Sequence, residues 1–116
     1  MRHPANITIA TNRVDIQGDR IKIAGVRHGE RVRIYEEYDY GKPIGYLEYI
    51  FIDGNELKGK CHFNKPCEGY PGIVFKIENE RTNDYGGVDY EGVELIAIGI
   101  SKENNQDPSI SKIKIE

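Results

Sequence analysis

The chain has 116 residues, a formal net charge of -3, two cysteines and no tryptophan. This length fits one domain spanning residues 1–116 and can bury about 65% of the unfolded surface without help from a metal or a disulfide. The small net charge, with both signs interspersed, argues against a nucleic-acid partner, and the lack of an apolar run of about 20 residues argues against membrane insertion.

Alternating apolar and polar residues, which are typical of half-buried strands, recur along the chain. They predict strands at 7–9, 14–16, 21–23, 31–35, 44–51, 73–77, 96–100 and 113–115. Gly, Asp and Asn residues stand between these runs and tolerate the positive φ angles of tight turns. No segment carries a helical stripe of apolar residues. The pattern therefore predicts an all-β chain of about seven to nine antiparallel strands.

Three connections can be assigned from residue type. Residues 39–43 predict a turn between two strand-like runs, and Asp53-Gly54 is a strong signal for a two-residue hairpin turn. The stretch 81–92 is rich in Asn, Asp, Gly and Tyr, which predicts a long surface loop.

Several motifs occur in a characteristic order along the chain. They are Asn6 to Ile9, Ile21 to Val26, Gly29 to Tyr35, Gly41 to Gly45, Ile52 to Asn55, and Ile96 to Ser101 followed by Asp107 to Ile113. This order resembles bacterial immunoglobulin-like and fibronectin type III-like modules. The resemblance implies an antiparallel β-sandwich that acts in spacing, adhesion or ligand binding. The chain departs from these modules at 67–91, which is longer than the usual connection and contains an extra strand-like run.

Cys61, His62 and Cys67 form the one cluster of soft metal ligands. A structural zinc site needs four Cys or His donors, usually as two close pairs, and His3 and His28 are remote in sequence. Zinc is therefore not expected. The two cysteines either form a disulfide that closes a small loop or remain buried thiols, and the sequence leaves both alternatives open.

Six of the eight tyrosines lie in or beside two acidic segments, 36–42 and 81–92. Tyrosine offers an apolar ring with a polar tip, which suits contacts with sugars and proteins. If the segments meet at one end of the sandwich, they form a binding patch. Its members are Tyr38, Asp39, Tyr40, Asn83, Asp84, Tyr85, Asp89 and Tyr90. The competing interpretations are a weak calcium site, solvated surface charge, and tyrosines that pack as ordinary strand residues.

No nucleophile motif, phosphate-binding glycine loop or distinctive carboxylate pair occurs, so we predict neither an enzyme nor a cofactor. We expect a structural or binding module of a surface or secreted protein, with a glycan or protein partner and with neighbouring modules in a larger chain. The alternative is a small regulator or assembly subunit that works by edge-strand addition, for which 110–116 is a candidate strand. A cytoplasmic location would follow if Met1 were the natural start, because no apolar signal segment follows it.

Overall fold

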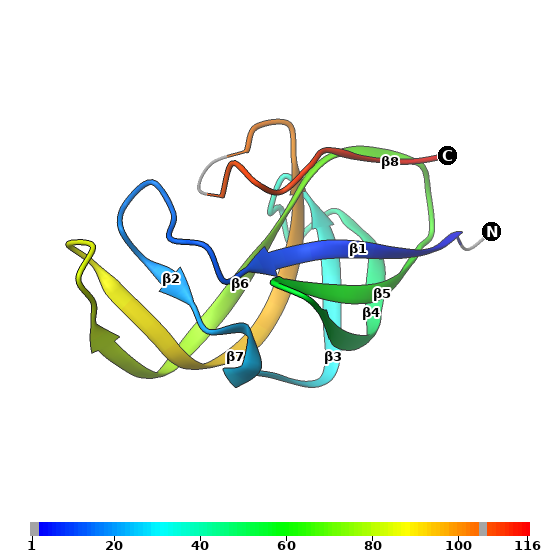
Figure 1. Ribbon diagram of the computed structural model, residues 1–116. Coiled ribbons are helices and arrows are strands. Elements are labelled where there is room, and N and C mark those ends of the chain that lie inside the picture. The colour runs from blue at the N-terminus through cyan, green and yellow to red at the C-terminus, as the bar shows by residue number, and fades with distance from the viewer. Residues whose placement is uncertain (1–2, 105–106) are drawn as a thin grey trace.

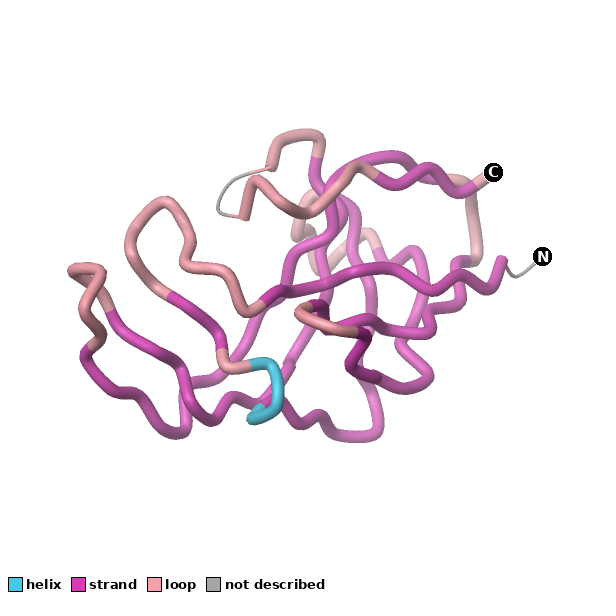
Figure 2. The backbone as a smooth tube through the Cα atoms, viewed as in Figure 1, coloured by secondary structure: helices cyan, strands magenta, loops and turns pink. Residues whose placement is uncertain are grey.

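The computed structural model describes residues 3–104 and 107–116, which form one mixed β-sheet curled almost into a barrel (Figure 1). The strands are β1 (His3–Thr11), β2 (Arg20–Ile21), β3 (Val26–Glu36), β4 (Pro43–Asp53), β5 (Glu56–Phe63), β6 (Cys67–Thr82), β7 (Val88–Ser101) and β8 (Ile113–Ile115). The described helical structure is a single 3-10 turn, η1 (Ile23–Gly25), as Figure 2 shows. The prediction of an all-β chain is confirmed. None of the described segments is a helix that could span a membrane.

The strand order is β1-β5-β4-β3-β7-β6-β8, with β2 also paired to β7. The consecutive strands β3 and β4, β4 and β5, and β6 and β7 form antiparallel hairpins, whereas β2 and β3 run parallel to β7. The prediction of a purely antiparallel structure is therefore wrong. A parallel pair needs a long crossover, and here three intervening strands provide it between β3 and β7.

The core lies inside the curl of the sheet, and β5 shows how the alternating pattern builds it. Leu57, Cys61 and Phe63 point inward and are buried, while Lys60 and His62 between them point outward. Inward residues of β1, β3, β4 and β7 complete the same cluster. Its members outside β5 include Ile7, Ile9, Val32, Ile34, Ile44, Leu47, Leu95, Ile98 and Ile100.

The hairpin between β4 and β5 confirms the strongest turn signal but shifts it by one residue. Asp53 pairs with Glu56, so Gly54 and Asn55 form the two-residue turn. Gly54 has a φ of 62°, and a two-residue hairpin with positive φ at its first position favours glycine there.

The strands predicted at 14–16 and 21–26 are wrong or shortened. In the first, the Asp15 carboxylate accepts hydrogen bonds from the N–H groups of Gln17 and Asp19, which folds the segment into a turn. In the second, β2 ends at Ile21, and the Asn12 side chain accepts the N–H of Ile23 where the chain enters η1.

The long loop predicted at 81–92 is also wrong, because β6 continues to Thr82 and β7 begins at Val88. Polar residues form strands here because they pair across the hairpin, as the ion pair of 2.9 Å between Arg81 and Glu91 illustrates. The extra strand-like run at 72–78 is confirmed as part of β6. The resemblance also implies that the last strand pairs with the run at 96–101, but β8 pairs with β6 instead.

We predict that Phe63→Ala destabilises the protein by about 3–5 kcal/mol, because the ring is fully buried and its removal leaves a cavity. Urea unfolding measures this difference. The control is Ile16→Ala, whose side chain is 72% exposed and should change stability by no more than about 0.5 kcal/mol. Equal losses in the two variants would contradict the assignment of the core.

Candidate functional site

A groove of about 480 Å³ lies along β6 beyond the point where β8 ends. Its walls come from the end of β1, the loop 12–19, β6 and the segment that follows β7. Four aromatic residues, Tyr38, Tyr70, Phe75 and Tyr90, line it. Six charged residues also line it: Arg13, Asp15, Asp19, Arg20, Glu103 and Asp107.

The groove exists because β8 is short. It pairs with Cys67, Glu68 and Gly69 only, and the described strands leave β6 with β7 as its one partner from Tyr70 onward. The residues that line the groove, Tyr70 to Ile73 and Phe75, begin where this pairing stops. The main chain of β6 therefore forms part of the groove wall.

Tyr38 lines the groove and is held in an unusual conformation. It and Glu37 have φ angles of 58° and 50°, in the left-handed region that non-glycine residues rarely occupy. Glu37 anchors the turn, since its N–H donates to the carbonyl of Ile100 and its carboxylate accepts hydrogen bonds from Ser101 and the N–H of Lys102.

Two glycines make room for the Tyr38 ring. Gly72 and Gly99 are paired across β6 and β7, and a Cβ atom built at either position would overlap Tyr38. Burial raises the pKa of the Tyr38 hydroxyl, with a smaller contribution from Glu37. The turn 36–42 is thus fixed to the outside of β6 and β7.

Tyr90 also lines the groove, where it packs against Phe75 with ring centroids 5.4 Å apart in an edge-on arrangement. Burial is the main cause that raises the pKa of Tyr90, and the nearby Asp19 and Glu80 carboxylates add to it. The pair forms an apolar floor beside the charged loop 12–19.

Arg20 and Asp89 join the loop 12–19 to the β6–β7 hairpin. The Arg20 guanidinium donates to both carboxylate oxygens of Asp89, at 3.1 and 2.7 Å, and Asn83 donates to the same carboxylate at 3.1 Å. The Lys22 Nζ lies 3.7 Å from the same Asp89 carboxylate. The hydrogen bond from Arg20 lowers the pKa of Asp89 to about 2. The charge of Arg20 is therefore already balanced within the protein.

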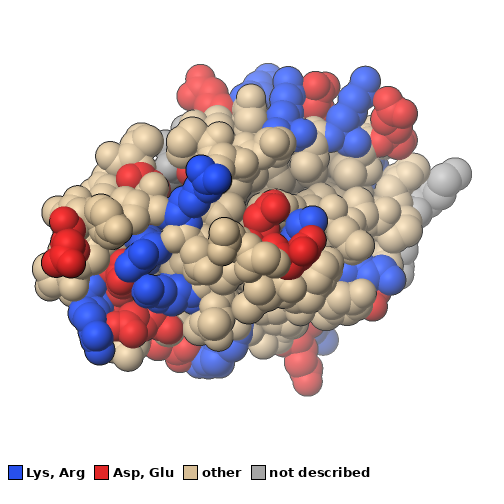
Figure 3. Space-filling view, in the orientation of Figure 1, with Lys and Arg blue, Asp and Glu red and all other residues tan. Residues whose placement is uncertain are grey.

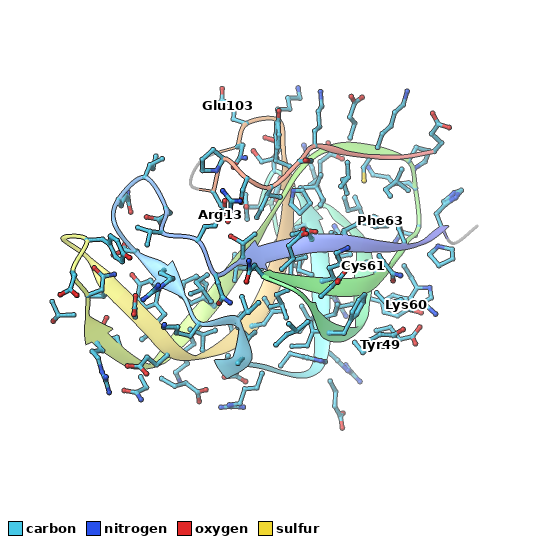
Figure 4. All side chains as sticks on the ribbon, in the orientation of Figure 1. Arg13, Tyr49, Lys60, Cys61, Phe63 and Glu103 are labelled. Atoms are coloured by element: carbon cyan, nitrogen blue, oxygen red, sulfur yellow. The ribbon has the colours of Figure 1, made fainter. Side chains whose placement is uncertain are left out.

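Three of the groove carboxylates also bond within the protein. Asp15 accepts two main-chain N–H groups of its own turn, Asp19 accepts the N–H of Val88, and Asp107 accepts the Thr11 hydroxyl at 2.5 Å. The charged groups of Arg13 and Glu103 make no hydrogen bond or ion pair to any described residue. Both are exposed, with Arg13 on the loop that follows β1 and Glu103 on the segment that follows β7 (Figure 4).

Of the eight residues predicted from the sequence as a binding patch, the groove brings together Tyr38 and Tyr90. Asp39 accepts the N–H of Gly41 within its own turn, and the Tyr40 ring packs 4.7 Å from Tyr35. These two do not line the groove.

The remaining four predicted residues lie in or beside the turn between β6 and β7. Asn83 holds this turn, because its side-chain oxygen accepts the N–H groups of Tyr85 and Gly87. Asp89 is the buried partner of Arg20. Asp84 and Tyr85 are exposed, and the Tyr85 ring lies 5.7 Å from the Arg20 guanidinium.

Sequence reasoning missed several groove residues, namely Arg13, Asp15, Asp19, Arg20, Tyr70, Phe75, Glu103 and Asp107. They come from three separate stretches, 13–20, 70–75 and 103–107, and no local pattern relates those stretches. One signal was present: Pro71 comes just before the strand-like run 73–77, and proline at the start of a strand or within it favours an edge position.

Both cysteines are free thiols in this structure. Burial raises the pKa of Cys61 to about 12, which keeps it protonated at neutral pH. His62 between them in sequence points outward, where its ring stacks on Tyr46 with centroids 4.9 Å apart and its Nε2 lies 2.5 Å from Glu48. Across residues 3–104 and 107–116, no group of three or more His, Cys, Asp or Glu side chains could hold a metal ion. The weak calcium site remains a prediction.

Acidic and basic side chains are interspersed on the face that Figure 3 presents, without a large patch of one sign. Comparisons with protein families, with curated proteins and with solved structures found no match to this chain.

We predict that Gly99→Ala destabilises the protein by about 1–3 kcal/mol, because the added methyl group overlaps the Tyr38 ring. The same substitution in a Tyr38→Ala background should cost much less, since the nearest atoms to the new Cβ all belong to Tyr38. Urea unfolding of the wild type, both single variants and the double variant measures the coupling. Additive losses would show that Tyr38 does not occupy this slot.

We also predict that ionised Asp89 stabilises the fold at neutral pH. Its pKa is about 2 in the folded protein and about 3.9 in an unfolded chain, so its contribution is complete above about pH 5 and is lost as the pH falls through 2. Urea unfolding between pH 5 and pH 2 should show Asp89→Asn less stable than the wild type at pH 5, with the difference shrinking toward pH 2. A difference that stays constant with pH would contradict this assignment.

Proposed function

We propose that the protein is a non-catalytic binding module that holds a segment of a partner protein in the groove along β6. The observation that carries this proposal is the position of the groove, which follows the edge of β6 that faces away from β7 and that no described strand pairs with beyond Gly69. Aromatic and aliphatic side chains beside a few polar groups are the usual lining of a binding site. Exposed strand edges are a recurring place for a peptide to bind.

Two charged side chains of the groove that make no hydrogen bond or ion pair to a described residue, Arg13 and Glu103, support a binding role. Arg13 and Glu103 are exposed beside the groove, whereas Arg20, Asp15, Asp19 and Asp107 already bond within the protein. A partner can therefore pair with Arg13 and Glu103 without breaking the network that holds the loops. Tyr38 and Tyr90 both line this site.

A protein segment fits this site better than the glycan expected from the tyrosine-rich loops. In the predicted patch, the polar side chains of Asp39, Asn83 and Asp89 already form hydrogen bonds within the protein. Tyr40 and Tyr85 lie outside the groove. The immunoglobulin-like or fibronectin III-like identity, the surface or secreted location, and the absence of catalysis are part of this proposal and rest on the sequence motifs.

The test is display of random peptides on phage, selected against the intact chain, followed by affinity measurements on the enriched peptides. The groove variant is Arg13→Ala/Tyr70→Ala. The matched control is Tyr49→Ala/Lys60→Ala, which removes an exposed tyrosine and a cation on the outer face of β4 and β5, away from the groove (Figure 4).

We expect the groove variant to bind the enriched peptides at least tenfold more weakly than the wild type, and the control to bind within twofold. A failure to enrich any peptide, or equal binding by the groove variant, would refute the proposal. A parallel panel of insoluble polysaccharides tests the rival role: binding that Tyr85→Ala abolishes would assign the site to the loops and to a glycan.

A further inference from the structure

We propose that the bound segment is an extended, basic peptide that joins the sheet as a strand and continues the row that β8 begins. This inference rests on the binding role proposed above and adds the conformation, the place and the charge of the partner. Three features of the described residues lead to it.

The first feature is the interrupted row beside β6. Gly69, Glu68 and Cys67 pair with Ile113, Lys114 and Ile115 in antiparallel register. If β8 extended toward the N-terminus, its next residues would lie opposite Tyr70 and Pro71. The chain instead turns away before β8, because Ile110 is buried and the Asn104 side chain holds the carbonyls of Asp107 and Ile110. The protein's own described C-terminal segment therefore leaves the place beside Tyr70 to Ile73 open.

The second feature is the direction of the free main-chain groups. Pro71 has no N–H, so a sheet tolerates it only where its nitrogen faces away from the paired neighbour, here β7. Successive residues of a strand direct their N–H and C=O groups to alternate sides. Ile73 therefore directs both groups to the same side as Pro71, toward the groove. An added strand would accept the N–H of Ile73 and donate to the carbonyls of Pro71 and Ile73.

The length of the free edge limits the length of the partner. The register of β6 against β7 shifts between Val74 and Phe75, and such a bulge bends a strand and interrupts regular pairing. The regular edge thus runs from Tyr70 to Val74. At about 3.3 Å per residue, it accommodates a partner segment of about five residues.

The third feature is charge. Asp15, Asp19, Glu103 and Asp107 line the groove with Arg13 and Arg20. The lining therefore carries four carboxylates against two guanidinium groups, and the Arg20 guanidinium is also paired with Asp89, which lies outside the lining and is shared with Lys22. Lys or Arg side chains on the partner complement this surface, and the attraction weakens with salt.

The test uses the intact chain and a fluorescent seven-residue probe of alternating Lys and Val. Two further probes carry backbone N-methyl groups on the Lys or on the Val positions, and a fourth replaces every Lys by Glu. A strand pairs along one edge only through alternate residues, so one methylated probe should lose at least tenfold in affinity while the other binds like the parent. The Glu probe should bind at least tenfold more weakly than the Lys probe. The Glu103→Gln variant should bind the Lys probe more weakly than the wild type does. The control variant Glu30→Gln, which removes an exposed charge on β3, should bind the Lys probe like the wild type.

Amide hydrogen exchange gives a second readout. Saturation with the Lys probe should slow exchange at Ile73 at least tenfold and leave Gly54, in the distant β4–β5 turn, unchanged. Equal binding by both methylated probes, or unchanged exchange at Ile73, would refute strand addition while the groove remains the site. Lack of binding by the Lys probe would refute the basic, extended partner. Loss of all peptide binding in the display experiment would instead refute the proposed function.

Discussion

The structure depends on β7, because this strand pairs with three others and supports both the core and the groove. β3 and β2 lie on one side of it and β6 on the other. One face of β7 supplies Leu95, Ile98 and Ile100 to the core, and the other face receives the Tyr38 ring at Gly99. The ion pair between Asp89 on β7 and Arg20 on β2 extends this support to the loop beside the groove. A change in β7 therefore alters several parts of the molecule together.

The groove is a consequence of how the sheet fails to close. A sheet that curls into a barrel removes its edges only when the first and last strands pair along their whole length. Here β8 is three residues long, and the chain before it is held by Asn104 and by burial of Ile110. Residues of the loop 12–19, together with Glu103, Asn104, Asp107 and Ile110, then line the groove beside this part of β6. The site is thus made by the termination of one strand rather than by a dedicated binding loop.

Much of the fold could be predicted from the sequence, because alternation and turn chemistry act over short distances. The alternation of Leu57, Cys61 and Phe63 with polar residues marked β5, and Gly54 marked its hairpin. The pairing of β3 with β7 could not be predicted, since the residues in contact are about 65 positions apart and carry no complementary signal of their own. Polar composition misled the prediction at 81–92, where cross-strand pairing forms strands from residues that usually form loops. For the site, sequence reasoning identified Tyr38 and Tyr90 but not the other lining residues. It also selected Asp39, Asn83 and Asp89, whose side chains could bind a ligand but instead hold turns or pair with Arg20.

The slot occupied by Tyr38 has a consequence for how this chain can change during evolution. Its ring takes the space where the side chains of positions 72 and 99 would otherwise stand. A relative with a small residue at position 38 would be free to carry larger residues at both glycine positions, and the turn 36–42 would then lose its hold on the sheet. These three positions should therefore vary as a set, and their covariation in distant relatives would trace the groove where overall sequence similarity no longer does.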